Sequence, residues 1–306
     1  MSILSKPYFH NEAEAYVYLE SVLWPNGPVC PHCGSVERIS AMGGKATRIG
    51  LKKCYACRQQ FTVKVGTVYE SSHVPLHKWL QATFLMASSK KGISAHQLHR
   101  TLEVTYKTAW FMAHRIREAM KDDSISPIGG QNKVVEIDET YVGGKEKNKH
   151  ANKRLRAGRG SVGKAPVVSL VERGGKVRSM HLPEVTAKTL KPVLKTHINK
   201  QTYLMTDEAK VYPAVTDDFA GHGSVNHSSG EYVRGNFWHT NTVENYFSIL
   251  KRGIIGTFHH VSQQHLARYV AEFDFRYNER GVDDLTRTVA VLGGVKGKRL
   301  TYRRAN

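Results

Sequence analysis

The sequence predicts an α/β fold in which helices cover a mixed β-sheet, preceded by a cysteine-bearing module and a helical region. Three observations lead to this expectation: a β-branched run at 134–142, two apolar runs joined by a turn at 173–176, and a helical segment at 186–198 followed by a strand that ends in an acid. Strands and helices in this order form layered α/β domains. The length of 306 residues allows two or three domains.

The composition indicates an anionic partner. The chain carries 45 Lys and Arg residues against 26 Asp and Glu residues, a formal net charge of +19. Such an excess favours binding to nucleic acid or to an anionic membrane surface. Membrane is the weaker choice, because the apolar runs fall far short of the roughly 20 residues of a spanning helix. The N-terminus lacks the apolar core of a signal peptide, so we expect a cytoplasmic protein.

The first elements are a short helix and a metal module. A capping pattern at Asn11 and Glu14 precedes apolar residues at helical spacing. In a reducing compartment, two close cysteine pairs indicate a metal site and not disulfides. Four thiolates close a tetrahedral zinc site without an open position, so the sequence predicts a structural zinc ribbon. Its ligands would be Cys30, Cys33, Cys54 and Cys57. The basic residues around it suit a DNA-facing surface but could equally be solvated charge.

Three helices are expected between 75 and 120. Pro75 starts the first, Ser94 can cap the second, and Thr105 can cap the third. A short helix, a brief turn and a longer helix form the helix-turn-helix pattern, whose second helix enters the major groove of DNA. A plain helical linker with a solvated polar face has the same spacing. In the DNA-reading alternative, the candidate contacts are Tyr106, Lys107, Thr108 and Arg115.

Three acidic residues on separate elements are the candidate catalytic groups. Asp138 lies inside the β-branched run, where a carboxylate must be paired, hydrogen-bonded or bound to metal, because a dry charge costs many kcal/mol. Asp207 ends another apolar strand, and Glu244 lies in the first turn of an amphipathic helix at 240–252. We expect the three to converge on divalent metal. Two metal ions about 4 Å apart, bridged by carboxylates, perform phosphodiester chemistry.

Neighbouring acids leave rival assignments open. Glu136 and Glu139 lie beside Asp138, and Glu208 follows Asp207. Glu136 shares a strand face with Asp138 by the two-residue period, so its position alone does not separate the two. For a lone Asp in a strand, structural ion pairs are also commoner than catalysis.

Three further basic features are candidate DNA contacts. The segment 145–164 holds eight Lys or Arg residues against the single acid Glu146, so we expect a mobile loop ordered by phosphate, although solvated charge has the same composition. In the helix at 240–252, Lys251 lies two turns after Glu244 on the same face, where it can contact a phosphate. The C-terminal basic arm is expected to be disordered without DNA. The named candidates are Lys153, Arg154, Arg156, Lys251 and Arg252.

Taken together, these motifs resemble bacterial insertion-sequence transposases that couple an N-terminal zinc ribbon to a DDE core of the ribonuclease H-like fold. The resemblance runs from about 9 to 278. The segments that carry it are 24–27, 66–68, 75–80, 108–110, 136–144, 206–208, 239–260 and 272–278.

The resemblance implies that Asp138, Asp207 and Glu244 hold Mg²⁺ (or Mn²⁺) and that the protein nicks element ends and transfers the strands into target DNA. It implies double-stranded DNA as the partner, in the form of terminal repeats and target, and a bacterial, nucleoid-associated location. Bringing two ends together requires a homo-oligomer, at least a dimer. The expected domains are a leading helix and zinc ribbon at 1–70, a helical DNA-binding region at 71–128, a ribonuclease H-like catalytic domain at 129–290 and a basic tail at 291–306.

Two other functions fit parts of the sequence. A noncatalytic, domesticated zinc-ribbon protein would use only the two DNA-reading modules. A stand-alone nuclease of ribonuclease H type would act on RNA-containing hybrids, for which those modules have no evident use.

Overall fold

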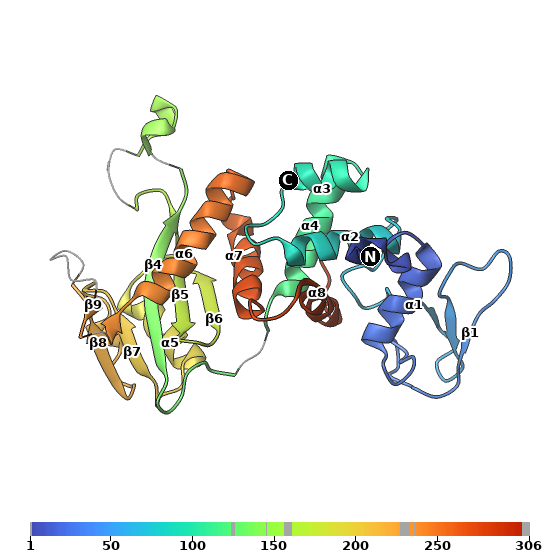
Figure 1. Ribbon diagram of the computed structural model, residues 1–306, viewed down its shortest axis with the longest axis horizontal. Coiled ribbons are helices and arrows are strands. Elements are labelled where there is room, and N and C mark those ends of the chain that lie inside the picture. The colour runs from blue at the N-terminus through green and yellow to red at the C-terminus, as the bar shows by residue number, and fades with distance from the viewer. Residues whose placement is uncertain are drawn as a thin grey trace. The chain divides into compact units, whose positions relative to one another are not determined.

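The computed structural model describes residues 2–123, 126–144, 146–155, 161–226, 233–235 and 237–301. The chain forms two compact units (Figure 1). One consists of Met1–Lys121 together with Gly281–Asn306, and the other of Asp122–Arg280. The expected domain boundaries remain predictions; the helix at 284–293 packs against helices of the first unit.

The first unit combines a helical core with a small antiparallel sheet. Its central helix α2 contacts α1, α3, α4 and α8 and buries Leu76, Trp79 and Leu80. The expected helices form, and the sheet joins its strands in the order β1-β2-β3. The elements are η1 (Ile3–Ser5), η2 (Pro7–Phe9), α1 (Glu12–Leu23), β1 (Ile39–Ala41), β2 (Lys52–Cys54), β3 (Gln60–Phe61), α2 (Leu76–Ser88), α3 (Ala95–Leu102), α4 (Tyr106–Met120) and α8 (Asp284–Gly293).

The basic tail is docked on the first unit, which corrects the expectation of a disordered arm. Lys296 forms an antiparallel bridge with Thr67, and the backbone N–H of Gly297 donates to the Gly66 carbonyl at 2.9 Å. Val295 is fully buried. Backbone pairing and apolar burial therefore hold residues 295–300 in place, whereas Arg303 and Arg304 lie outside the described residues.

The second unit is built on a five-stranded mixed sheet in the order β6-β5-β4-β7-β8. Strands β4, β5 and β6 are antiparallel neighbours, and β7 and β8 run parallel to β4 after the crossover helix α5. This topology is that of a ribonuclease H-like fold, as expected. The strands are β4 (Val134–Val142), β5 (Ala165–Glu172), β6 (Val177–His181), β7 (Tyr203–Thr206) and β8 (Gly221–Ser224).

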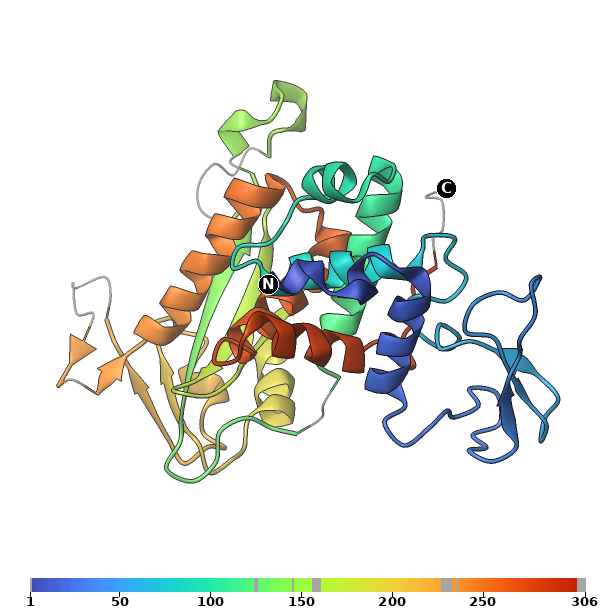
Figure 2. The same ribbon diagram turned by 45° about the vertical axis from the view of Figure 1, so that its right-hand side comes forward.

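Helices cover both faces of this sheet (Figure 2). On one face, Val135 and Ile137 of β4 belong to a core cluster with Leu190 and Leu194 of α5. On the other face, α6 and α7 pack on β4, β5 and β6. The remaining elements are η3 (Glu146–Asn148), η4 (Ala151–Lys153), α5 (Ala187–His197), η5 (Pro213–Val215), the small pair β9 (Val233–Arg234) and β10 (Trp238–His239), α6 (Asn241–Gly253), the π-helix η7 (Ile254–Phe258) and α7 (Gln263–Asn278).

Helix α7 closes the exposed edge of the sheet with two side chains one turn apart. The Asn278 amide accepts from the Val177 N–H at 2.7 Å and donates to the Val177 carbonyl at 3.0 Å, as a neighbouring strand would. Asp274 accepts from the Ser179 N–H and hydroxyl, each at 2.7 Å, and from the Tyr246 hydroxyl at 2.6 Å. An unpaired strand edge invites association with other chains, so these contacts protect β6.

We expect Asp274→Ala to destabilise the second unit by about 2–4 kcal/mol, because it removes the carboxylate that accepts from three donors, the Ser179 N–H and hydroxyl and the buried Tyr246 hydroxyl. Burial raises the pKa of Asp274 to about 6, so at pH 7.5 the ionised acceptor is the form removed. Chemical denaturation at pH 7.5 would measure the change. Asp217→Ala, at an exposed position, is the control and should leave the free energy of unfolding unchanged. Equal effects of the two substitutions would contradict a structural role for Asp274.

None of the helices in the described ranges combines the length and hydropathy that crossing a membrane requires.

Candidate active site and zinc site

The four cysteines come together at one end of the three-stranded sheet. Their Sγ atoms all lie within 4.8 Å of one another, with 3.6 Å between Cys30 and Cys57 and 3.7 Å between Cys33 and Cys54. Four Zn–S bonds of about 2.3 Å in a tetrahedron separate the sulfur atoms by about 3.8 Å. The donor set therefore fits a closed structural zinc site. The Cys57 backbone N–H lowers the pKa of the Cys54 thiol, whereas the net effect of their surroundings raises the pKa of Cys33 and Cys57, so the fit to zinc is carried by the geometry of the four sulfur atoms.

Asp138 lies on the sheet face that α6 covers. Its neighbour Ile137 points to the α5 side, and side chains alternate along a strand, so Asp138 points to the α6 side. Burial, together with the smaller effect of the negative charges of Asp207, Glu139 and Glu244, raises the pKa of Asp138 to about 7. The acids from the three predicted segments therefore act on one another electrostatically.

Strand register explains why Asp207 lies near Asp138. Strand β7 runs parallel to β4, and their last pair joins Met205 to Glu136. Asp138 and Asp207 each lie two residues beyond that pair, on the same face and at the same level. Neighbouring strands are about 4.8 Å apart, so the two carboxylates come from adjacent backbone positions. The Asp207 carboxylate accepts from the Ala209 N–H at 3.0 Å.

Glu244 comes from the first turn of α6, the helix that packs on β4. Its Oε1 atom accepts from the Thr240 hydroxyl at 3.0 Å. Among the described residues, the four cysteines are the group of candidate metal ligands whose ligand atoms all lie within 4.8 Å of one another. The oxygens of the three carboxylates are farther apart than that. The arrangement is a half-buried acid cluster at the end of the parallel strands.

The rival acids have other partners or lie at the surface. Glu136 is fully buried and forms an ion pair with Arg173 in which Nε lies 2.6 Å from Oε1. Glu139 accepts from the Tyr212 hydroxyl at 2.5 Å, and burial raises its pKa. Glu208 is exposed. These contacts favour Asp138 and Asp207 over their neighbours, which the sequence pattern alone did not do.

The helix-turn-helix candidates have different surroundings. Helices α3 and α4 are joined by a tight turn in which Glu103 is left-handed, with a φ of 51°, and Thr105 caps α4. Lys107 is exposed in the first turn of α4, and the Thr108 hydroxyl lies 2.8 Å from that of Thr105.

Arg115, in contrast, is buried, and its guanidinium donates to three backbone carbonyls. The acceptors belong to Val68, Glu70 and Leu300, at 2.9, 3.0 and 3.1 Å. This geometry gives Arg115 a structural role, holding the C-terminal tail, and we leave it out of the DNA-contact set.

The basic segment after β4 is partly ordered by its own contacts. The described residues 146–155 form two 3-10 turns, in a segment where a mobile loop ordered by phosphate was expected. Glu146 pairs with Lys149 and accepts from the Leu155 N–H at 2.9 Å, and Arg154 donates to the Lys149 carbonyl at 2.8 Å. Lys153 and Arg154 are exposed, whereas Arg156 lies outside the described residues.

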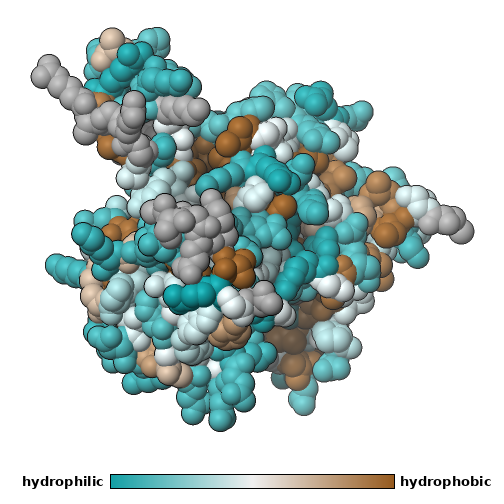
Figure 3. Space-filling model, turned by 60° about the vertical axis from the view of Figure 1, so that its left-hand side comes forward, coloured by the Kyte–Doolittle hydropathy of each residue, from teal (hydrophilic) through white to brown (hydrophobic). Residues whose placement is uncertain are grey.

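Lys251 and Arg252 are exposed in the last turn of α6, at the opposite end of the helix from its first-turn residue Glu244. Hydrophilic side chains cover most of the molecular face in Figure 3, and hydrophobic ones lie there in small groups. These two cations remain candidates for phosphate contacts.

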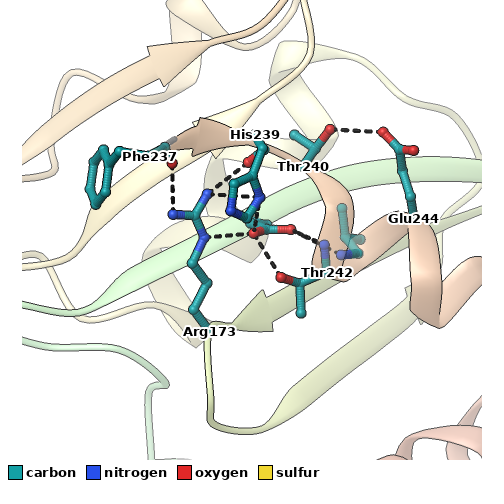
Figure 4. A network of polar contacts seen from close by, with 8 residues as sticks. Arg173, Phe237, His239, Thr240, Thr242 and Glu244 are labelled. Carbon is teal, nitrogen blue, oxygen red and sulfur yellow. Dashed lines mark hydrogen bonds and ion pairs between the residues drawn. The ribbon is translucent and has the colours of Figure 1, made fainter. Parts of the chain in front are cut away.

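Arg173, His239 and Thr240 also belong to this site, although no sequence pattern indicated them. Arg173 was assigned only to a hairpin turn, yet its guanidinium bonds Glu136 and the carbonyls of Phe237 and His239 (Figure 4). No local pattern could have indicated contacts between positions so far apart in the chain.

Two family models match the ribbon and the second unit, and other known chains are similar to this one. The family model described as ISXO2-like transposase domain matches residues 129–278, and that of a transposase zinc-ribbon domain matches residues 10–60. A protein of Halobacterium salinarum, described as an uncharacterized protein in transposable element ISH50, is 30% identical over 278 residues, covering 88% of this chain and 91% of its own. A chain in the cryoEM structure of simian T-cell lymphotropic virus intasome with PP2A regulatory subunit B56 gamma has 15% identity and a TM-score of 0.28, covering 59% of this chain and 67% of that chain.

Proposed function

Because the chain belongs to the family of ISXO2-like transposases, we propose that it cleaves DNA strands at the ends of its element and joins them to target DNA, with Asp138, Asp207 and Glu244 as the catalytic acids. The observation that carries this proposal is the acid cluster itself. Three acids from β4, the end of β7 and the first turn of α6 meet on one face of a ribonuclease H-like sheet.

The acid cluster fits a divalent cation, Mg²⁺ or Mn²⁺. Burial and three neighbouring negative charges raise the pKa of Asp138, so a positive charge among them would relieve both causes. Oxygen ligands of this kind are those that Mg²⁺ prefers. When bound, the metal would supply activation of a water or 3′-hydroxyl and stabilisation of the leaving oxygen.

The remaining residues bind and orient DNA in this proposal. Lys251 and Arg252 contact phosphates about two helical turns along α6 from Glu244, away from the acid cluster itself. The exposed first turn of α4, with Lys107 and Thr108, enters the major groove. Lys153 and Arg154 add phosphate contacts, and the zinc ribbon contributes a second DNA-facing surface. Two element ends must meet for joining, so the active form is at least a dimer, acting in the cytoplasm on chromosomal DNA.

An end-joining assay tests the proposal. The purified full chain would be incubated with a labelled duplex that carries the end of its own element, supercoiled target plasmid and Mg²⁺. We expect nicked end DNA and labelled plasmid, both dependent on the metal. Cleavage of RNA–DNA hybrid without joining of duplex ends would instead favour a ribonuclease H-type nuclease. Specific binding to the end duplex without any cleavage would favour a noncatalytic DNA-binding protein.

We expect Lys107→Ala to weaken binding to the end duplex and to reduce the slope of log K against log salt by about 0.9, because one phosphate contact is lost. Fluorescence anisotropy at several salt concentrations would measure the slope. Lys188→Ala, at an exposed position on α5, is the matched control. An unchanged slope for Lys107→Ala would remove α4 from the proposed DNA interface.

A further inference from the structure

Helix α6 is capped by a residue from another element. A helix leaves its first backbone N–H groups without partners inside the helix. The residue at the N-cap position, Thr240, makes no side-chain cap hydrogen bond. Instead, the Thr242 and Val243 N–H groups donate to Oε2 of Glu136 on β4, at 2.8 and 3.0 Å (Figure 4). A carboxylate at this end of a helix is also favoured by the helix dipole.

The capping carboxylate is fully buried and is held by further donors. Its Oε1 atom accepts from Arg173 Nε at 2.6 Å and from the Thr242 hydroxyl at 2.9 Å. His239 Nδ1 lies 3.2 Å from the same oxygen. A buried charge is tolerated only when it is paired and hydrogen-bonded, and Glu136 meets that condition on both oxygens.

Arg173 extends this contact to the chain that leads into the helix. Its two terminal nitrogens donate to the carbonyls of Phe237 and His239, each at 2.8 Å. These carbonyls belong to β10 and the residue before it. The Glu136–Arg173 pair thus fixes both the entry into α6 and its first turn to β4, the strand that carries Asp138.

Because Glu136 caps α6 from β4, the Thr240 hydroxyl can form a hydrogen bond with a different residue. A threonine at the N-cap normally accepts from the N–H two or three residues into the helix. Here Glu136 serves both of those groups, and the Thr240 hydroxyl donates to Glu244 Oε1 at 3.0 Å. The residue that would ordinarily stabilise the helix end instead orients the carboxylate of the proposed catalytic acid.

We propose that Glu136, Arg173 and Thr240 are positioning residues: Glu136 and Arg173 fix the start of α6 on β4, and Thr240 orients the Glu244 carboxylate for metal binding. This inference rests on the proposed function, because it takes Glu244 and Asp138 as metal ligands. A single N-cap hydroxyl cannot both cap the helix and orient the Glu244 carboxylate. In this arrangement Glu136 performs the first task and Thr240 performs the second. Loss of Glu136 affects the stability of the helix, whereas loss of the Thr240 hydroxyl affects metal binding.

Full-length Glu136→Gln, Thr240→Val and Thr240→Ser chains test this separation. Thermal unfolding without added Mn²⁺ measures stability, and calorimetric titration with Mn²⁺ measures metal binding independently of DNA joining. We expect Glu136→Gln to lower the melting temperature by several degrees. Thr240→Val should melt like the wild type but bind Mn²⁺ about tenfold more weakly, the usual effect of losing a group that orients a metal ligand. Thr240→Ser keeps the hydroxyl and should restore wild-type binding.

Three outcomes would overturn the inference. A melting temperature for Thr240→Val as low as that of Glu136→Gln would make Thr240 the cap of α6. Mn²⁺ affinity equal to that of the wild type in Thr240→Val would remove its orienting role. A wild-type chain with no Mn²⁺ binding that depends on Asp138 would refute both this inference and the proposed metal site. If the expected differences appear but no variant or wild-type chain joins DNA, the positioning inference stands and the proposed transposition chemistry fails.

Discussion

Asp138→Asn is expected to reduce DNA cleavage and joining by more than about 100-fold while leaving the fold intact. Loss of a group that merely orients a metal ligand already costs about 10–100-fold, so loss of a proposed direct ligand should exceed that range. An asparagine has the same shape but no charge, so it would be a much weaker ligand for a divalent cation than a carboxylate. The end-joining assay with Mg²⁺ measures the rate, and the same duplex measures DNA binding, which should be unchanged.

The same substitution should stabilise the metal-free protein. Burial raises the pKa of Asp138 to about 7, so the ionised carboxylate is the unfavourable form in the fold. The group binds its proton more tightly in the folded state, so its contribution to stability is present below the unfolded pKa of about 4 and is lost as the pH rises through about 7. At pH 8, removing the charge should therefore raise the melting temperature, and it should abolish any further rise on adding Mg²⁺.

This combination of lost activity and higher stability distinguishes an active-site acid from a structural one. Glu136→Gln provides the contrast, because the Glu136 carboxylate accepts hydrogen bonds from four protein donors and its loss should lower the melting temperature. Asp217→Asn at the surface should change neither property. If Asp138→Asn instead melted below the assay temperature, unfolding would explain its loss of joining, and this result would contradict the catalytic assignment.

The local patterns in the sequence were sufficient to predict the sheet, its covering helices and the acids. The β-branched run at 134–142 predicted strand β4. The apolar run that ends in an acid predicted strand β7 and the position of Asp207. Side-chain alternation placed Glu136 and Asp138 on one face of this strand and left Glu139 as a further candidate. These predictions depend only on residues within one element, where periodicity reports which side is buried.

The choice between those two acids depended on contacts that local patterns do not contain. The partner of Glu136 in α6 is 106 residues away in sequence, and Arg173 is 37 residues away. Arg115 illustrates the same limit. Its position in a candidate recognition helix suggested a DNA contact, but the carbonyl of Leu300, 185 residues away, is among its acceptors. An arginine has five N–H donors that can satisfy distant carbonyls as readily as phosphates, so residue type alone does not separate the two roles.

Removing zinc is expected to unfold the ribbon and to leave the unit Asp122–Arg280 folded. The ribbon strands β1, β2 and β3 contain three, three and two residues. The buried members of its core cluster are Phe61 and two of the cysteines themselves. So small a core does not offset the entropy of ordering the chain, and the binding of structural zinc contributes about 10–16 kcal/mol at pH 7 in comparable modules. The core clusters of the second unit, in contrast, contain only residues between 128 and 277.

Zinc release and proteolysis would test this expectation together. A chelator, or Cys33→Ser without chelator, should release one zinc per chain and make the segment 30–57 sensitive to protease, while the fragment that contains Asp122–Arg280 persists. His32→Ala is the matched control: His32 lies between two ligands, but four thiolates already complete a tetrahedral site, so this variant should retain its zinc. A chelated chain that resists cleavage at 30–57 would mean that the ribbon is held by packing. Because the proposed acids lie outside the ribbon, a chelated and repurified chain resupplied with Mn²⁺ should still bind it through Asp138, and only its binding to DNA should weaken.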